Sequence, residues 1–469
     1  MAILGGGGVT VNVGASRPYP RPGGETDPGL GFVPLARTTF DLALAGLVAD
    51  QARAALRHSG LQLVGPDSLV TDLQQATAAA AALASQPIDL LVVFQATFAD
   101  STMALHLAQA VPAPLLLWAV PEERSGGRLR LNSFCGVNLA AHALQRHGRR
   151  YDYLYAPPDD PQALDQVHLL ARAGRAVRWL RQARIGRVGE NPSGLDTCEL
   201  DREALARRFG LEVVQIDLAE AFAAVRQAAP QEVEGVYQEL KARLAGLEDV
   251  DPAATRRTLA THLALRRMAE QRNLAGLAVR CWPEFFTDLG CAACGAMSLL
   301  SDQGIPCSCE ADVNGTLTQL LLQWIGGQPA FGADIVSFDL RDDSAVLWHC
   351  GLAPLAMADP AVQPRATVHS NRRLPLLMEF PLRPGRVTLA RLSEATGSYR
   401  LVAGSGEMLR APMSFAGTSG VLRFDRPAQH ILDTLLGEGL EHHIALTYGD
   451  HLPTLLALAG MLDLPVLQL

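Results

Sequence analysis

The chain has 469 residues, of which 48% are hydrophobic and 19% are charged, and its formal net charge is −8. This length predicts two or three domains, and the composition is ordinary for a soluble globular protein. No long basic block is present, so the sequence gives no support for a nucleic-acid partner.

The scarcity of lysine excludes three classes of active site. Lys241 is the only lysine, and it lies in a charged stretch predicted to be a solvated helix. Schiff-base aldolases and pyridoxal-phosphate enzymes need a desolvated lysine in the pocket, and a Walker P-loop needs one after its glycines. We therefore do not expect any of these chemistries.

The ends and the cysteines predict a cytoplasmic protein with reduced thiols. The N-terminus lacks the pattern of a secretory signal, and no apolar run has the length of a membrane span. Glycines 5–8 are interpreted as a flexible terminus and not as a nucleotide loop, because no strand precedes them. The cysteines between 291 and 309 are predicted to be a buried thiol cluster, with structural zinc as the alternative.

The first third alternates helices and strands. The predicted helices cover residues 40–57, 71–85 and 101–110, and the predicted strands cover 61–64, 89–94 and 114–119. Such alternation predicts a parallel, doubly wound sheet. We place the first domain at residues 1–155, up to a polar, proline-marked linker.

The second domain, residues 156–333, repeats the pattern. Helices are predicted at 163–184, 201–209 and 292–303 and a long charged helical region at 231–271, with strands at 185–189, 211–216 and 277–282. The strand at 277–282 is expected to deliver Glu284, and the segment 304–309 leads to Glu310 and Asp312. Because ligands of parallel sheets gather at the carboxyl ends of strands, Glu284 and Asp312 are predicted to share one site.

The last domain, residues 334–469, carries many short β-like runs separated by turns, which predicts an antiparallel, barrel-like sheet. Its candidate site residues are histidines: the pair His442 and His443, before the predicted strand 444–448, and His349. In a strand, the two imidazoles of the pair point to opposite faces, so only one of them can serve a given pocket.

Carboxylates and imidazole together suit Mn²⁺ or a similar divalent ion. Glu284 and Asp312 follow apolar stretches, where an unpaired carboxylate suffers a desolvation cost. The alternatives are an ion pair with an arginine for Glu284 and an N-cap of the following helix for Asp312.

Several motifs, in order, resemble the L-fucose isomerase and L-arabinose isomerase superfamily. They are Asn132-Ser133-Phe134-Cys135-Gly136, Arg187-Val188-Gly189, Trp282-Pro283-Glu284, Cys309-Glu310-Ala311-Asp312-Val313-Asn314-Gly315, Trp348-His349-Cys350-Gly351, Pro384-Gly385-Arg386-Val387-Thr388, and His442-His443 with Tyr448-Gly449-Asp450. The resemblance implies two Rossmann-like domains followed by a β-rich domain, and a homo-oligomer, trimeric or hexameric.

The resemblance also implies a Mn²⁺ site of Glu284, Asp312 and His443, with His442 the weaker choice of the pair and His349 a possible fourth ligand. The implied activity is aldose–ketose isomerisation of a monosaccharide such as L-fucose or L-arabinose through a cis-enediol. A divalent ion stabilises the enediolate, and Glu284 and Asp312 would shuttle the protons, with the base and the acid left unassigned. The alternatives are a catalytically inactive sugar-binding or regulatory protein and a metal-dependent dehydratase or epimerase.

Overall fold

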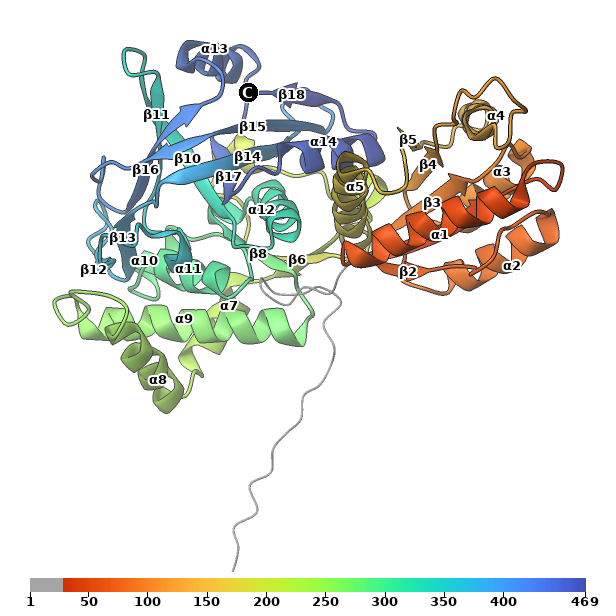
Figure 1. Ribbon diagram of the computed structural model, residues 1–469. Helices are drawn as coiled ribbons and strands as arrows, with labels where there is room; N and C mark the ends of the chain where they lie inside the picture. The colour runs from red at the N-terminus through yellow and green to blue at the C-terminus, as the bar shows by residue number, and fades with distance from the viewer. Residues whose placement is uncertain (1–27) are drawn as a thin grey trace, which may run out of the picture.

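The computed structural model describes residues 28–469, so the glycines at 5–8 lie outside the described part of the chain. Three sheets organise the described residues (Figure 1). Two of them are parallel, and the third, at the C-terminal end, is mainly antiparallel. The predicted order of α/β units followed by a β-rich region is confirmed.

The first sheet has the order β2-β1-β3-β4-β5, and all its pairings are parallel. Its strands are β1 (Gly29–Leu35), β2 (Gln62–Val64), β3 (Leu90–Gln95), β4 (Leu115–Ala119) and β5 (Asp152–Tyr155), and its helices are α1 (Leu42–His58), α2 (Leu73–Ala84), α3 (Ser101–Ala110) and α4 (Ser133–Arg146). β3 and β4 are buried at every position, as expected for central strands of a sheet that is covered on both faces.

Helix α5 (Pro161–Leu180) joins the first sheet to the rest of the molecule (Figure 1). Asp160 caps its first turn, and the proline sits where a missing N–H costs nothing. The helix lies so close to the first sheet that a Cβ added to Gly174 would be 1.9 Å from the carbonyl oxygen of Asp89. Arg178 also pairs with Asp89 at 2.7 Å. This close approach holds α5 against the first sheet.

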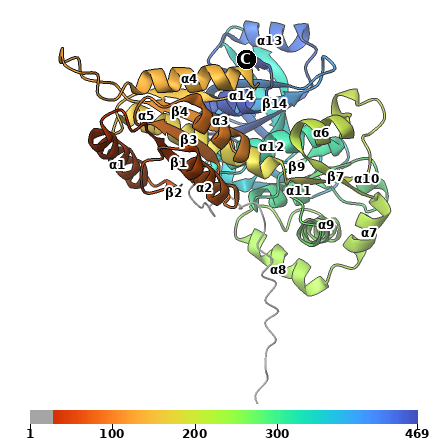
Figure 2. The ribbon, with the colours of Figure 1, turned by 90° about the vertical axis from the view of Figure 1, so that its right-hand side faces the viewer.

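The second sheet is parallel, in the order β7-β6-β8-β9. Its strands are β6 (Arg184–Val188), β7 (Glu212–Ile216), β8 (Gly276–Val279) and β9 (Cys307–Ser308), and its helices are α6 (Arg202–Phe209), α7 (Leu218–Arg226), α8 (Pro230–Lys241), α9 (Pro252–Gln271), α10 (Glu284–Thr287), α11 (Cys294–Asp302) and α12 (Val313–Gly326). Short 3₁₀ turns, η1 (Asp196–Cys198) and η2 (Cys309–Ala311), follow β6 and β9. In both views the sheet lies between the C-terminal barrel and helices α8 and α9 (Figures 1 and 2).

Two predicted elements differ from the structure. The helical region 231–271 is two helices, because the chain leaves α8 at Lys241 and a new helix begins at Pro252, capped by Asp251. The strand expected at 277–282 ends at Val279, and Glu284 opens the short helix α10 instead of following the strand directly. Four residues therefore separate Glu284 from the end of β8.

The C-terminal region forms a closed barrel. β16 pairs with both β11 and β15, which closes the ring β16-β11-β10-β17-β14-β15. The strands are β10 (Phe331–Asp339), β11 (Ser344–His349), β12 (Arg365–Thr367), β13 (Leu377–Pro381), β14 (Gly385–Ser393), β15 (Arg400–Leu409), β16 (Thr418–Phe424), β17 (His443–Tyr448) and β18 (Val466–Gln468), with the turn η3 (Leu355–Met357) and helices α13 (Ala428–Gly437) and α14 (Leu452–Met461). Closure leaves the six ring strands without a free edge.

The barrel and the second sheet share a hydrophobic core. One cluster of buried side chains runs from Val188 on β6 to Leu446 on β17, and α12 packs against strands of both. The predicted division into residues 1–155, 156–333 and 334–469 stays a prediction. Within residues 28–469, no helix is long and apolar enough to cross a membrane.

Candidate active site

Three barrel strands bring one carboxylate and two imidazoles together. Asp334 on β10 is the direct cross-strand partner of His443, the first residue of β17, and His349 ends the neighbouring strand β11. The His443 Nε2 lies 3.5 Å from Asp334 Oδ1, and the rings of His349 and His443 stack with centroids 6.1 Å apart. The register of β10 with β17 therefore sets Asp334 opposite His443.

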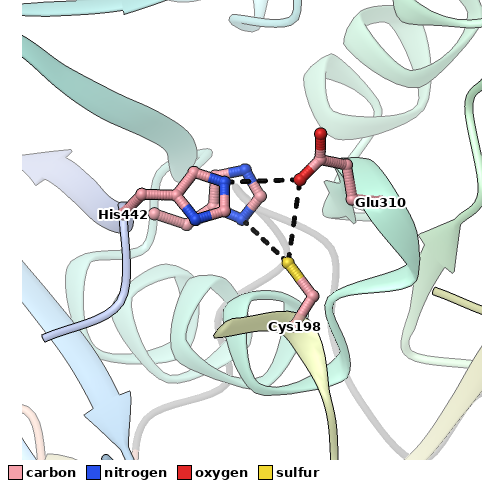
Figure 3. Close-up of side chains that lie close together, drawn as sticks. Cys198, Glu310 and His442 are labelled. Atoms are coloured by element: carbon pink, nitrogen blue, oxygen red, sulfur yellow. Dashed lines mark hydrogen bonds and ion pairs between the residues drawn. The ribbon is translucent and has the colours of Figure 1, made fainter. Parts of the chain in front are cut away.

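The turn η2 supplies a second carboxylate. Glu310 Oε2 lies 3.3 Å from His442 Nε2, and Glu310 Oε1 accepts a hydrogen bond of 3.1 Å from Trp282 Nε1. The Cys198 thiol, at the end of η1, is 3.8 Å from the same carboxylate and 3.9 Å from His443 Nδ1 (Figure 3). Glu310 has a backbone φ of 58°, a left-handed conformation that costs energy for a non-glycine residue and is common at functional sites.

Asp312 is fully buried and has three partners. It caps helix α12 through the Gly315 N–H at 2.8 Å, and it accepts bonds from Arg391 at 2.6 Å and from His443 Nδ1 at 3.0 Å. Burial raises the pKa of Asp312, but Arg391 and His443 outweigh it and hold the pKa well below its ordinary value. An ionised Asp312 fixes the proton of His443 on Nδ1, so Nε2 keeps its lone pair.

The titratable groups beside this core fall into distinct protonation states. Burial, reinforced by Asp312 and Glu310, raises the pKa of the Cys198 thiol, which makes it a neutral neighbour and a poor ligand. Burial lowers the pKa of His442, but Glu310 and Asp334 outweigh it and the net pKa is raised. For Glu310, burial raises the pKa, and His442 and His443 bring it below its ordinary value.

Glu284, one of the predicted ligands, lies apart from this core. Its two oxygens each accept a bond of 2.8 Å from Arg280, so the ion-pair alternative for this residue is what the structure contains. The Arg280 hydrogen bond lowers the pKa of Glu284. No contact recorded for residues 28–469 joins Glu284 to Asp312 or His443. Its roles as ligand and as proton-transfer residue stay predictions.

The structure therefore unites only part of the predicted set. Asp312 and His443 are in contact, but Asp312 is occupied by the helix N-terminus and by Arg391. Within the described residues, two groups of potential ligand atoms lie within 4.8 Å of one another: Cys198, Glu310, His442 and His443, and Asp334, His349 and His443. His443 belongs to both groups, which makes it the centre of the candidate site.

Sequence reasoning assigned no role to Glu310 or Asp334. Glu310 stands two residues before Asp312 in the motif that indicated a site. The motif therefore located the site, but the ligand role was assigned to Asp312. Asp334 gave a weaker signal, because only the pairing of β10 with β17 sets it against His443. The cysteines at 291, 294, 307 and 309 are buried, as predicted, but Cys309 contacts Cys281 and Cys294 contacts Cys350. The choice of thiols over structural zinc stays a prediction.

A cavity of about 520 Å³ opens beside the histidine pair. Its wall includes His442, His443 and Glu441, and the rest is mainly apolar side chains of β10 and α13. The His442 side chain is 40% exposed and Glu310 is 16% exposed, so small solutes can reach both groups. Glu310 and Asp334, with the imidazoles of His442 and His443, can bind a cation and move protons on a polar substrate. Of these four residues, His442 and His443 line the cavity.

Comparisons with known proteins identify the family of this chain. Residues 31–181 match the model of the fucose/sulfoquinovose isomerase N-terminal domain, and residues 379–469 match that of the L-fucose isomerase C-terminal domain. A sulfoquinovose isomerase of Priestia aryabhattai is 30% identical over 92% of this chain and 97% of its own length. The chain belongs to the L-fucose isomerase-like family.

Other relatives carry the same name. Sulfoquinovose isomerases of Alkalicoccus urumqiensis and a Clostridium species are 30% and 29% identical over 93% and 92% of this chain, and over 98% and 97% of their own lengths. Members of these families are aldose–ketose isomerases, and so is this protein. This assignment supersedes the alternatives of a catalytically inactive binding protein and of a dehydratase or epimerase.

Proposed function

We propose that this protein is a divalent-metal-dependent isomerase that converts sulfoquinovose into the corresponding 2-ketose. The names of the relatives support the substrate. The observation that carries the metal dependence is the surroundings of His443: Asp312 accepts a hydrogen bond from its Nδ1–H, and the free Nε2 faces Asp334. The metal would be Mn²⁺ or a similar ion, since the donors are carboxylate oxygen and imidazole nitrogen.

The proposed ligands are Asp334 and His443, which belong to one group of neighbouring ligand atoms, and Glu310, which belongs to the other group that contains His443. This set keeps His443 from the sequence prediction, replaces Glu284 by Glu310, and replaces Asp312 by Asp334. Asp334 Oδ1 is buried without a hydrogen-bond partner within the described residues, which is costly unless a cation satisfies it. Asp312 then acts as the residue that orients His443, as carboxylates commonly do behind a metal-bound histidine.

His349 fits a different role. The backbone N–H of Cys350 donates to its Nδ1 at 2.9 Å, so the proton of the neutral ring is on Nε2. Nε2 of His349 is then a hydrogen-bond donor with no free lone pair for a metal. This supports a role for His349 in lining the site and donating a hydrogen bond. The fourth-ligand role implied by the resemblance would require the bond from the Cys350 N–H to break.

The reaction needs a proton to leave C2 of the open-chain aldose and a proton to arrive at C1. A bound divalent ion supplies Lewis-acid stabilisation of the enediolate oxygens. Glu310 is the proposed base, because its lowered pKa keeps it ionised and able to accept a proton, and because it is accessible. It takes the proton from C2 and returns it to C1, while Asp334 passes the hydroxyl proton from O2 to O1. No proton or electron is gained or lost overall.

The test incubates the chelator-treated and the Mn²⁺-reloaded protein with sulfoquinovose in D₂O and follows the products by NMR. We expect turnover only in the reloaded sample and deuterium at C1 of the ketose. L-Fucose, L-arabinose and D-glucose complete the panel. Equal turnover before and after chelation would refute the metal dependence, and preference for a sugar without a sulfonate would refute the substrate.

A matched pair of variants tests the ligand set. Glu310→Gln should lower kcat by at least about 100-fold, because it removes both the base and a ligand, whereas Glu284→Gln should retain most activity. Both variants exchange one carboxylate for an amide, so global effects are comparable. The reverse pattern would restore the assignment predicted from the sequence. The family resemblance also supports a homo-oligomer, which sedimentation measures directly.

A further inference from the structure

The segment between β12 and β13 holds two hydrogen-bond donors that face each other. The backbone N–H groups of Asn371 and Arg372 point at Nδ1 of His369, at 3.3 and 3.4 Å. A neutral ring accepts at one nitrogen only, and the two backbone donors at Nδ1 favour the tautomer with the proton on Nε2. Nε2 lies 3.4 Å from Nη1 of Arg372, which is always a donor and would bond to Nε2 directly in the other tautomer. With the proton on Nε2, both groups are donors and can share an acceptor beside them.

His369 is held in the neutral state that this geometry requires. The residue is only 7% exposed, and its ring packs edge-on against Phe286 at 5.3 Å. Burial, followed by the charges of Arg372 and His349, lowers the pKa of His369 to about 4. At neutral pH the ring thus presents an uncharged N–H donor.

Arg372 is fixed in place by aromatic rings and not by an acid. Its guanidinium carbon lies 5.0 Å from the ring centroids of both Trp282 and Phe286, a cation–π arrangement that leaves the N–H edge available. The other cations near the site are neutralised: Arg280 by Glu284 and Arg391 by Asp312. Within residues 28–469, no ion pair with a carboxylate is recorded for Arg372.

One contact places these donors beside the candidate active site. Trp282, which packs under Arg372, donates to the proposed base Glu310 at 3.1 Å. A sugar whose C1 and C2 lie at Glu310 can therefore extend its far end toward Arg372.

We propose that His369 Nε2–H and the Arg372 guanidinium form a subsite for the sulfonate group of the substrate. The inference rests on the proposed function, because it names the residues that would distinguish sulfoquinovose from an uncharged hexose. A sulfonate offers three acceptor oxygens and a permanent negative charge, and the pair of donors matches both. The acids at the other end of the site repel an anion, which favours this one orientation.

The test compares Arg372→Ala and His369→Phe with Arg373→Ala, which removes the neighbouring exposed arginine. Steady-state kinetics are measured with sulfoquinovose and with 6-deoxy-D-glucose, which lacks only the sulfonate. The latter is followed as a substrate or through its competition with sulfoquinovose, so its affinity is obtained in either case. Circular dichroism and urea unfolding of each variant identify any loss of fold.

For Arg372→Ala we expect kcat/KM for sulfoquinovose to fall about 10- to 100-fold, mainly through KM, because a charge-assisted bond is lost. The affinity for 6-deoxy-D-glucose should change less than about threefold, and Arg373→Ala should resemble the wild type with both sugars. Arg372→Lys should recover part of the loss, since it restores the charge but not the planar fork.

The outcomes separate the two proposals. If the wild type leaves sulfoquinovose unconverted, the proposed function is refuted and the subsite loses its ligand. If the wild type converts it, but Arg372→Ala matches Arg373→Ala or weakens both sugars equally, the subsite alone is refuted.

Discussion

Replacing Arg391 by methionine tests the electrostatic core of the site. Arg391 is 3% exposed and lies 2.6 Å from Asp312, which is fully buried, and 3.9 Å from Glu441, which is 5% exposed. The substitution keeps a long apolar side chain but leaves two buried carboxylates without their cation. Removing one partner of a buried ion pair costs about 3–5 kcal/mol, so we expect Arg391→Met to lower the free energy of unfolding by this amount at pH 7.5.

The pH dependence follows from the direction of the Asp312 shift. The pKa of Asp312 is depressed in the wild type, so its stabilisation is present above the unfolded pKa of about 4 and is lost only as the pH falls below it. Without Arg391 the main influence that lowers this pKa is absent, and protonation in mild acid relieves the unpaired charge. The deficit of Arg391→Met relative to the wild type should therefore shrink between pH 7.5 and pH 5.

Urea unfolding followed by tryptophan fluorescence measures both effects. Arg391→Met combined with Asp312→Asn should be more stable than Arg391→Met alone, because asparagine still caps α12 but carries no charge. A single variant within about 1 kcal/mol of the wild type, or a deficit that grows toward pH 5, would show that the Asp312–Arg391 pair does not have the energetic role inferred here.

Two further substitutions probe the site and the scaffold. Asp312→Asn should weaken Mn²⁺ binding about 10- to 100-fold, because His443 loses the group that fixes its proton on Nδ1; calorimetric titration measures it, and unchanged affinity would remove Asp312 from the positioning role. Gly174→Ala should destabilise the protein by at least about 3 kcal/mol, since its Cβ would lie 1.9 Å from the Asp89 carbonyl oxygen. The control Gly235→Ala, within α8 with no atom within 4 Å of the new Cβ, should be neutral or stabilising by up to about 1 kcal/mol; similar effects of the two alanines would contradict the packing argument.

The sequence determined the order of elements and the chemistry of the site. Apolar runs such as β3 and β4 are readable because a central parallel strand is buried on both faces and needs no polar position. Caps such as Asp160 and Asp251 mark helix starts because they satisfy local N–H groups. These are short-range effects, and a pattern within a few residues records them. The same applies to Asp312 as an N-cap, an alternative that the spacing to Gly315 had allowed.

Only the tertiary structure decided which acids face the histidines. Glu284 and Glu310 are similar in the sequence, since each stands near an apolar strand. In the structure, Glu284 forms an ion pair with Arg280, whereas Glu310 faces His442. Asp334 meets His443 because β10 and β17, more than a hundred residues apart in the chain, pair in one register of a closed barrel. Strand register and side-chain partners depend on long-range packing that no local spacing encodes. The sequence therefore defined what kind of groups the site contains, and the fold selected which of them meet.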